Sequence, residues 1–221
     1  MTVLLILATF VVFLMLDYFL FRKRATAPAV QPAGESVPRT RPPFAAGFKF
    51  PENLRYHLGH TWALAESPQL VRVGLDDFAA RFIGRMESIT LPRRGQWVRQ
   101  GQKIWTVERS GKKTEMVSPV EGIVTDINEA AVRNPQLALH DPYGNGWLVT
   151  VQAPDAKTTF RNLLGGNVAR RWMEEAAARL RGGIPALAGA LAQDGGLTVE
   201  DVGALLSEEK WNELASEFFL S

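Results

Sequence analysis

The chain opens with an apolar run. Residues Val3 to Phe21 are apolar except for Thr9, Asp17 and Tyr18, and an α-helix needs roughly 20 such residues to cross the hydrocarbon core of a bilayer. The basic cluster Arg22-Lys23-Arg24 follows the run, and no Lys or Arg precedes it. A cleaved signal peptide would carry its positive charge before the run. The pattern predicts a transmembrane helix with a basic stop over residues 1–24.

The position of the basic cluster also predicts an orientation. Under the positive-inside rule the amino terminus lies outside and everything after Arg22 lies in the cytoplasm. We therefore expect a single-pass protein of the bacterial cytoplasmic (inner) membrane. Asp17 lies one turn from the cluster, so it is interpreted as an interfacial acid, with a functional charge inside the membrane as the alternative.

The next segment, residues 25–47, is rich in Pro, Ala, Ser, Gly and Arg. Repeated Pro favours extended, semi-rigid chain over a packed core. We interpret residues 25–47 as a linker that spaces a domain from the membrane.

From Phe48 to Asp155 the apolar positions form short runs separated by turn residues, a pattern typical of a β-sandwich or barrel. Two helical stretches interrupt it. One spans Asp76 to Ile83, with Asp76 or Asp77 as the amino-terminal cap, and a shorter one spans Asn128 to Arg133. Residues 48–155 are predicted to form a mainly β domain.

After Pro154 the apolar spacing becomes helical. Thr159 to Arg181 reads as helix divided near Gly165-Gly166, and further helical stretches follow over Ile184–Ala192 and Val199–Leu206. A last helix begins after Ser207, and its apolar side contains Trp211, Leu214, Phe218 and Phe219. Residues 156–221 are therefore predicted to form a helical extension, which either packs on the β domain or docks on a partner.

Within the β domain, residues 104–118 predict a β-hairpin. Two strand-like runs flank Ser110-Gly111, a pair suited to a tight two-residue turn. Lys112 and Lys113 follow the turn directly.

Composition excludes several classes of function. The chain contains no Cys, which removes disulfides and thiol chemistry. Its formal net charge of +2 comes without a basic stripe interleaved with aromatic residues, so no nucleic acid is expected as a partner. No phosphate-binding glycine loop and no nucleophile motif is present, so the protein is not expected to be an enzyme. His57 and His60 lack a third nearby ligand and are interpreted as structural, and no metal site is expected.

Residues from Tyr56 to Asp155 resemble the H protein of the glycine cleavage system, a member of the biotinyl/lipoyl fold. The resemblance implies a lipoyl-like barrel-sandwich hybrid domain from which the hairpin projects. The motifs that carry it are His60-Thr61-Trp62, Val73-Gly74-Leu75-Asp76-Asp77-Phe78-Ala79, Leu91-Pro92-Arg93-Arg94-Gly95, Gly101, Val107-Glu108, Ser118-Pro119-Val120-Glu121-Gly122, Asn128-Glu129, Asn134-Pro135-Gln136-Leu137 and Asp141-Pro142-Tyr143-Gly144-Asn145-Gly146-Trp147.

The resemblance also implies a cofactor position. Members of this family carry lipoate on a lysine at the hairpin tip, in a Glu-x-x-Lys pattern. When Glu108 and Ser118-Pro119 are kept in register, that position falls on Gly111, with Lys112 and Lys113 just beyond it. We therefore expect no cofactor, and lipoate on Lys112 or Lys113 is the alternative.

A second departure from the family concerns charge. The loop that is commonly acidic in the family contains Arg93, Arg94, Arg99 and Lys103 here, together with Trp97. Reversing the charge of a surface changes which partners it attracts. Arg93, Arg94, Trp97, Arg99, Lys112 and Lys113 are the candidate interaction residues, and a Trp97 packed beneath the loop is the alternative for that side chain.

These features together predict a membrane-anchored, non-lipoylated module that acts as an accessory or assembly subunit of a membrane complex, for example a respiratory or photosynthetic one. Its expected partners are other subunits of that complex, with membrane lipid around the amino-terminal helix. A membrane-tethered lipoyl carrier of the glycine cleavage type is the alternative. A further alternative is a recruiter that binds anionic lipid through Arg93, Arg94 and Arg99.

Overall fold

The structure, a computed structural model, describes Met15, residues 44–184 and residues 201–220. The chain divides into two compact units, residues 1–41 and residues 42–221. The predicted anchor from Val3 to Phe21, with Arg22, Lys23 and Arg24, lies outside the described residues, apart from the helical and exposed Met15. Among the described residues, no helix is both long enough and apolar enough to span a bilayer.

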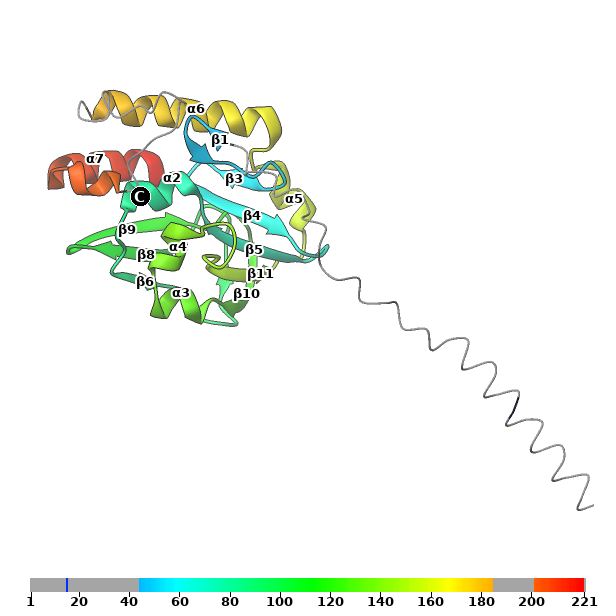
Figure 1. The fold of residues 1–221 in the computed structure, drawn as a ribbon. Helices are drawn as coiled ribbons and strands as arrows, with labels where there is room; N and C mark the ends of the chain where they lie inside the picture. The colour runs from blue at the N-terminus through cyan, green and yellow to red at the C-terminus, as the bar shows by residue number, and fades with distance from the viewer. Residues whose placement is uncertain (1–14, 16–43, 185–200, 221) are drawn as a thin grey trace, which may run out of the picture. The chain divides into compact units, whose positions relative to one another are not determined.

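The second unit is mainly β with helices, as the apolar pattern predicts (Figure 1). Its strands are β1 (Phe44–Ala45), β2 (Phe48–Lys49), β3 (Arg55–His57), β4 (Thr61–Ala65), β5 (Leu70–Leu75), β6 (Ser88–Thr90), β7 (Trp97–Val98), β8 (Lys103–Arg109), β9 (Lys112–Val117), β10 (Gly122–Ile127) and β11 (Val149–Gln152). Its helices are α2 (Asp77–Ile83), α3 (Glu129–Arg133), α4 (Gln136–His140), α5 (Ala156–Arg161), α6 (Gly166–Gly183), the 3-10 helix η2 (Val202–Leu205) and α7 (Glu208–Phe219).

The strands form antiparallel sheets that enclose the core. One sheet has the order β3-β4-β5-β11-β10-β7, a second has the order β6-β8-β9, and β1 pairs with β2. Inward-facing residues of the two larger sheets, among them Trp62, Val73 and Trp105, are buried between them. Alternation of buried and exposed positions along these strands is what a half-buried sheet requires.

The first pair of strands, β1 and β2, begins inside the residues predicted as linker. Phe44–Ala45 pairs with Phe48–Lys49 across Ala46 and Gly47, which both have positive φ. Ala45, Phe48 and Phe50 are buried in the core. The folded chain therefore starts before residue 48, because a short turn suffices to return the chain and bury these side chains.

Helix boundaries follow local capping. Asp76 accepts a hydrogen bond from the Ala79 amide at 2.8 Å, which identifies Asp76 rather than Asp77 as the cap of α2. Asn128 caps α3 in the same way. The predicted division of helix at Gly165-Gly166 is confirmed, because α5 ends at Arg161 and α6 begins at Gly166. The short helix α4 was not predicted.

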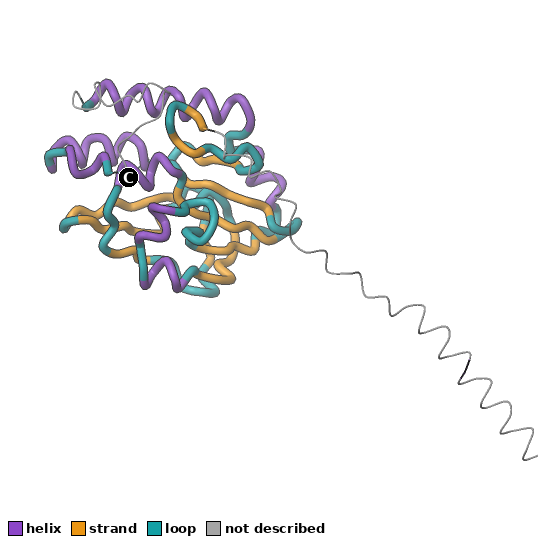
Figure 2. The backbone as a smooth tube through the Cα atoms, viewed as in Figure 1, coloured by secondary structure: helices purple, strands orange, loops and turns teal. Residues whose placement is uncertain are grey.

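The helices α6 and α7 pack on the β domain (Figures 1 and 2). Trp211, Leu214, Phe218 and Phe219 of α7 are buried in the same core as the strands, which answers the open question of what the apolar side of this helix covers. An ion pair of 3.3 Å between Arg179 and Glu217 joins α6 to α7. The predicted helix over Ile184–Ala192 falls outside the described residues, and Val202–Leu205 is a 3-10 helix rather than α-helix.

Candidate functional site

The β8–β9 hairpin has the predicted two-residue turn. Arg109 pairs with Lys112 and Glu108 with Lys113, which leaves Ser110 and Gly111 as the loop. Both loop residues have positive φ, 48° and 76°, as the mirror-image turns of tight hairpins require. Gly111 is exposed, and a Cβ atom at this position would meet nothing within 4 Å. The second residue of this turn, Gly111, therefore presents no side chain to the solvent.

Lys112 is not a freely solvated tip residue. Its Nζ donates to the backbone oxygen of Leu206 at 3.5 Å and lies 5.3 Å from the ring centroid of Trp211. A cation over the face of an indole is an attractive contact. These contacts form because the carboxy-terminal residues return to strand β9. Lys113, on the opposite face of β9, is exposed.

Arg109 on the other flank of the turn contacts the same part of the chain. Its guanidinium forms an ion pair with Asp201 and donates to the backbone oxygen of Ile83 at 2.7 Å. Gly203 packs closely on α2, since a Cβ there would lie 2.7 Å from the Phe82 oxygen. Both flanks of the hairpin are thus held by residues 201–220, hereafter the C-terminal segment.

The basic loop before β8 is divided by its ion pairs. Arg94 binds Asp126 at 2.9 Å and Glu129 at 3.2 Å, and Lys103 binds Glu115 at 3.2 Å. The Arg94 guanidinium holds the pKa of the Asp126 carboxyl below its usual range. Arg94 and Lys103 are therefore largely neutralised by their own chain.

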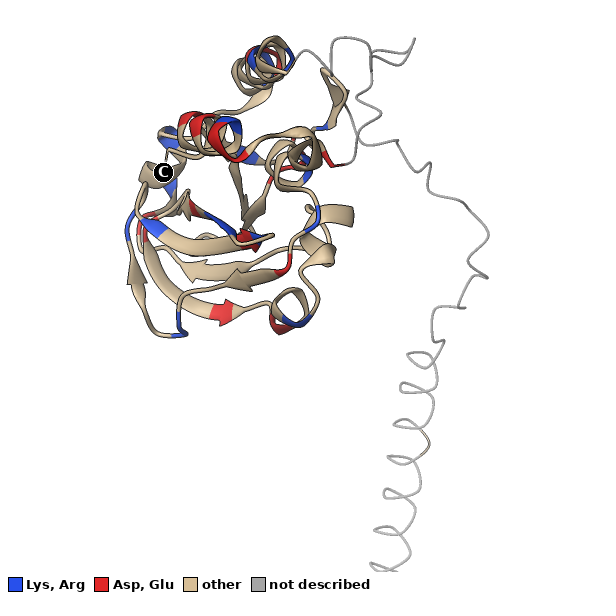
Figure 3. Ribbon diagram, turned by 90° about the vertical axis from the view of Figure 1, so that its left-hand side faces the viewer, with Lys and Arg blue, Asp and Glu red and all other residues tan. Residues whose placement is uncertain are grey.

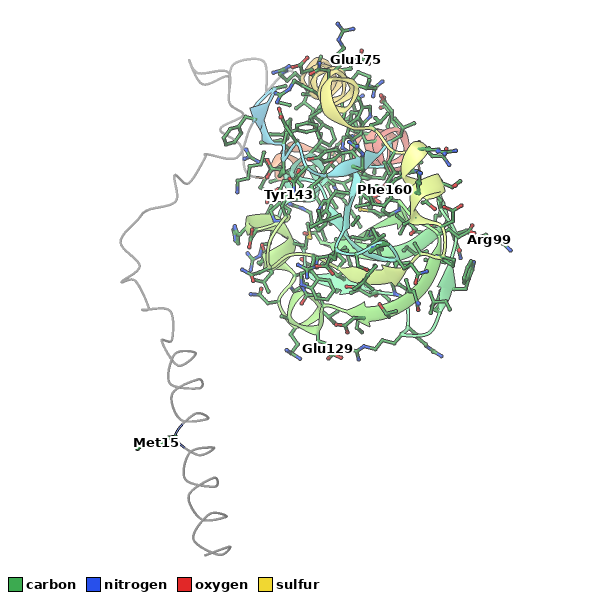
Figure 4. All side chains as sticks on the ribbon, turned by 90° about the vertical axis from the view of Figure 1, so that its right-hand side faces the viewer. Met15, Arg99, Glu129, Tyr143, Phe160 and Glu175 are labelled. Atoms are coloured by element: carbon green, nitrogen blue, oxygen red, sulfur yellow. The ribbon has the colours of Figure 1, made fainter. Side chains whose placement is uncertain are left out.

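Arg93, Trp97 and Arg99 remain exposed at this loop. Trp97 is 45 % exposed, so the alternative in which its ring packs beneath the loop is wrong. Arg99 projects from the margin of the molecule (Figure 4). Across the molecule, Lys and Arg are interspersed with Asp and Glu on helices as well as strands (Figure 3).

The two histidines of the motif region are structural. His60 is buried, its Nδ1 lies 2.8 Å from Asp76 Oδ2, and its ring stacks on Phe78 and Trp172. His57 accepts a hydrogen bond from the Gly59 amide on Nδ1 at 3.1 Å, and burial, followed by the nearby His60, lowers its pKa. Within the described residues no group of three His, Cys, Asp or Glu side chains could hold a metal ion.

Buried acids near α2 also serve the fold. Asp77 accepts from the Lys49 amide at 2.8 Å and from Arg81 at 3.0 Å, which ties α2 to β2. Burial nevertheless raises the pKa of Asp77, since desolvation outweighs these two partners. The hollow beside it is small and is lined by Lys49, Asp77, Arg81, Leu139 and His140. Nothing in this group resembles an acid-base pair aimed at a substrate.

Sequence reasoning did not find the contacts of the C-terminal segment with the hairpin, nor Ile123. Asp201 lies 92 residues from Arg109, and no local pattern signals such a pair. Ile123 is 39 % exposed and pairs directly with Trp97 in the β7–β10 register. The only sequence signal for Ile123 is an apolar residue within a strand. The alternation of apolar and polar residues does not show whether such a residue faces the core or the solvent.

Known proteins share this domain. Residues 54–176 match the family model described as glycine cleavage H-protein. A glycine cleavage system H protein of Legionella pneumophila (strain Corby) is 37 % identical over 112 residues, 51 % of this chain and 88 % of that protein. One from Mycobacterium avium (strain 104) is 37 % identical over 106 residues, 48 % of this chain and 80 % of that protein.

A solved structure agrees with the sequence comparisons. The crystal structure of a glycine cleavage system H protein from Mycobacterium marinum superposes with a TM-score of 0.50 at 27 % identity, covering 57 % of this chain and 98 % of that one. The family match ends within α6, so η2 and α7 lie outside it. The chain belongs to the glycine cleavage H-protein family.

Proposed function

We propose that this protein is a membrane-anchored H-protein-like module that carries no lipoate and acts through protein-protein contacts as an accessory or assembly subunit of a membrane complex. The observation that carries the proposal is Gly111 at the apex of the hairpin, in a backbone conformation suited to glycine. An amide-linked lipoyl group needs a lysine amine that projects from this apex.

The lysines that follow the apex do not fit the role equally. Lys112 is engaged with Leu206 and Trp211, so its amine is partly enclosed by the C-terminal segment. Lys113 is exposed, and this observation keeps a membrane-tethered lipoyl carrier as the second candidate, with Lys113 as its attachment point. Lys113 lies opposite Glu108 within the strand pair rather than in the turn, which favours the first candidate.

Membrane anchoring rests on the amino-terminal sequence. The apolar run from Val3 to Phe21 and the basic cluster behind it support a single-pass helix in a bacterial inner membrane with the β domain in the cytoplasm. Membranes of the producing cell should retain the protein through an alkaline carbonate wash and release it only with detergent. Release by carbonate alone would contradict the anchor.

Intact-mass measurement of the full-length protein, purified in mild detergent from its natural host, tests the absence of lipoate. We expect the mass of the unmodified chain. Gly111→Lys is the matched positive control, because it places a lysine at the position where the family resemblance puts the carrier residue. A lipoyl adduct on the natural protein that Lys113→Ala or Lys112→Ala abolishes would overturn the proposal in favour of the carrier.

The same detergent preparation tests the accessory role. We expect membrane subunits to accompany the protein at constant ratio through two different separations. Two results together would contradict this role. The protein would elute without companions in both separations, and the membrane complexes would assemble normally in a strain that lacks it.

A further inference from the structure

An apolar pair lies exposed where β7 borders β10. Trp97 is 45 % and Ile123 is 39 % exposed, and the two residues face each other directly across the strand pair. Side chains of opposed residues on one sheet face lie in contact. Trp is among the residues most enriched at the energetic centres of protein interfaces.

The surroundings of this pair are basic after internal ion pairs are removed. Within the described part of the chain, no ion pair engages the side chains of Arg93 and Arg99, whereas Arg94 and Lys103 are neutralised. Helix α5 adds the exposed Lys157 and Arg161, and its exposed cap Asp155 offsets part of their charge.

Gln100 fixes α5 beside the loop. Its side-chain amide donates to Thr159 at 3.0 Å and to Pro119 at 2.8 Å, and its oxygen accepts from Asn162 at 2.8 Å. The exposed acid Glu121, two positions before Ile123 on the chain, limits the positive charge on the other side. We name Trp97, Ile123, Arg93 and Arg99, with Lys157 and Arg161 of α5, the β7 patch.

The β7 patch contains an open hollow. Trp97, Arg99, Gln100, Gly101 and Gln102 line it. Gly101 has a positive φ of 78°, and a Cβ at that position would meet nothing within 4 Å. Gln102 supports one wall by accepting from the Arg99 amide at 2.9 Å. A hollow with fixed amides and a free guanidinium suits a carboxylate that Arg99 can bind with two hydrogen bonds.

We propose that the β7 patch binds an acidic polypeptide segment of a partner protein, with an apolar side chain of that segment on Trp97 and Ile123 and a carboxylate on Arg99. Charge complementarity selects the partner. An acidic polypeptide is favoured over a bilayer surface, because the hollow beside Arg99 can hold a single carboxylate. This inference rests on the proposed function, since it names the surface through which the module makes its contact.

Fluorescence anisotropy with a defined probe tests the inference. The probe is a fluorescein-labelled peptide in which Glu alternates with Leu, and its control has Lys in place of Glu. The protein is the full-length chain in nanodiscs of phosphatidylcholine. We expect the Glu peptide to bind and the Lys peptide not to bind. The affinity for the Glu peptide should fall as ionic strength rises.

Matched variants locate the binding. Trp97→Ala and Arg99→Glu should each lower the affinity for the Glu peptide by roughly tenfold. Val168→Ala and Arg171→Glu change an exposed apolar and an exposed basic position on α6 and should alter affinity by less than about twofold. Circular dichroism of every variant establishes that the fold is intact.

The outcomes separate this inference from the proposed function. Equal binding of the Glu and Lys peptides, or binding that the α6 variants weaken as much as the patch variants, would overturn it. Failure of the Glu peptide to bind, with amide exchange in residues 95–102 slowed by phosphatidylglycerol in the nanodisc, would assign the patch to lipid instead. Intact mass of the same samples reports on lipoate independently of all these results.

Discussion

The hairpin tip and the β7 patch belong to the same β domain but differ in what covers them. At the tip, Arg109 and Lys112 contact the C-terminal segment on both sides of the turn. At the β7 patch, Trp97 and Arg99 remain exposed, and the nearby helix α5 flanks the surface without covering it. At the tip the protein's own chain occupies the side chains of Arg109 and Lys112, while Gly111 and Lys113 stay exposed, and the β7 patch is open.

A partner protein would therefore gain more free energy of binding at the β7 patch than at the contacts of the hairpin tip. Arg109 and Lys112 already contact the C-terminal segment, so a partner that bound them would first have to displace Asp201, Leu206 and Trp211. An open Trp loses its water only when the partner arrives, and that burial then favours binding. The predictions below test how firmly the first surface is covered and how little the second contributes to the fold.

Phe218→Ala should have the largest effect. The ring of Phe218 is 2 % exposed and packs 4.9 Å from the ring centroid of Phe78 on α2. Truncating a buried Phe lowers the free energy of unfolding by about 3–5 kcal/mol, measured by denaturant unfolding of the full chain. Val168→Ala, on an exposed position of α6, is the control and should change it by less than about 0.5 kcal/mol. Equal values for both variants would mean that α7 is not part of the fold.

Arg109→Ala should have the next largest effect. It removes the ion pair with Asp201 and the hydrogen bond to Ile83, and it leaves the Ile83 oxygen without that donor. We expect a loss of about 1–3 kcal/mol and faster amide hydrogen exchange in residues 109–113, with exchange in residues 95–102 unchanged. Lys113→Ala is the control in the facing strand. Unchanged exchange at the hairpin would show that the C-terminal segment does not hold it.

Acid should lower the stability of the fold through His57 on β3. Burial lowers the folded-state pKa of His57 below its ordinary value of 6.5, so the unfolded chain binds the proton more readily. The contribution of neutral His57 to the free energy of unfolding is therefore fully present above about pH 6.5. It is lost as the pH falls from there through the lowered folded-state pKa.

His57→Asn tests this pH dependence, because its side-chain oxygen can still accept from the Gly59 amide without titrating. The free energy of unfolding should fall less steeply with acid in the variant than in the natural protein. Parallel pH curves for the two proteins would contradict the assignment.

Trp97→Ala should have the smallest effect on stability. Nearly half of the Trp97 side chain is in water, so we expect less than about 1 kcal/mol of change in the free energy of unfolding. Trp105→Ala, in the next strand along the chain, β8, is the matched comparison. Trp105 is 2 % exposed, and its loss should cost about 3–5 kcal/mol. Similar losses for both variants would remove the contrast between a structural and an interaction Trp.

Much of the fold could be predicted because its signals are local. Backbone preferences of a few neighbouring residues predicted the Ser110-Gly111 turn, an amino-terminal cap at Asp76 or Asp77 and the division of helix near Gly165-Gly166. The short elements β1 and α4 were missed, because pieces of this length carry almost no periodicity.

The candidate site could be predicted only in part. The sequence identified Arg93, Arg94, Trp97, Arg99, Lys112 and Lys113 as a set, but it could not divide them. Arg94 is paired with Asp126, which lies 32 residues away, and Lys112 contacts Leu206, which lies 94 residues away. These two side chains are therefore less available to a partner. Ion pairs and exposure depend on which distant segments meet, and single-sequence patterns do not contain that information.

The mainly β domain and the glycine at the hairpin apex could be read from the sequence, since both follow from short-range spacing and backbone preference. The proposed membrane anchor also depends on a local feature, the apolar run at the amino terminus. The contacts of the C-terminal segment with Arg109 and Lys112, and the exposure of Trp97 and Arg99, became visible only in the folded chain. Burial is a property of the whole packed chain, whereas a turn is a property of its own residues.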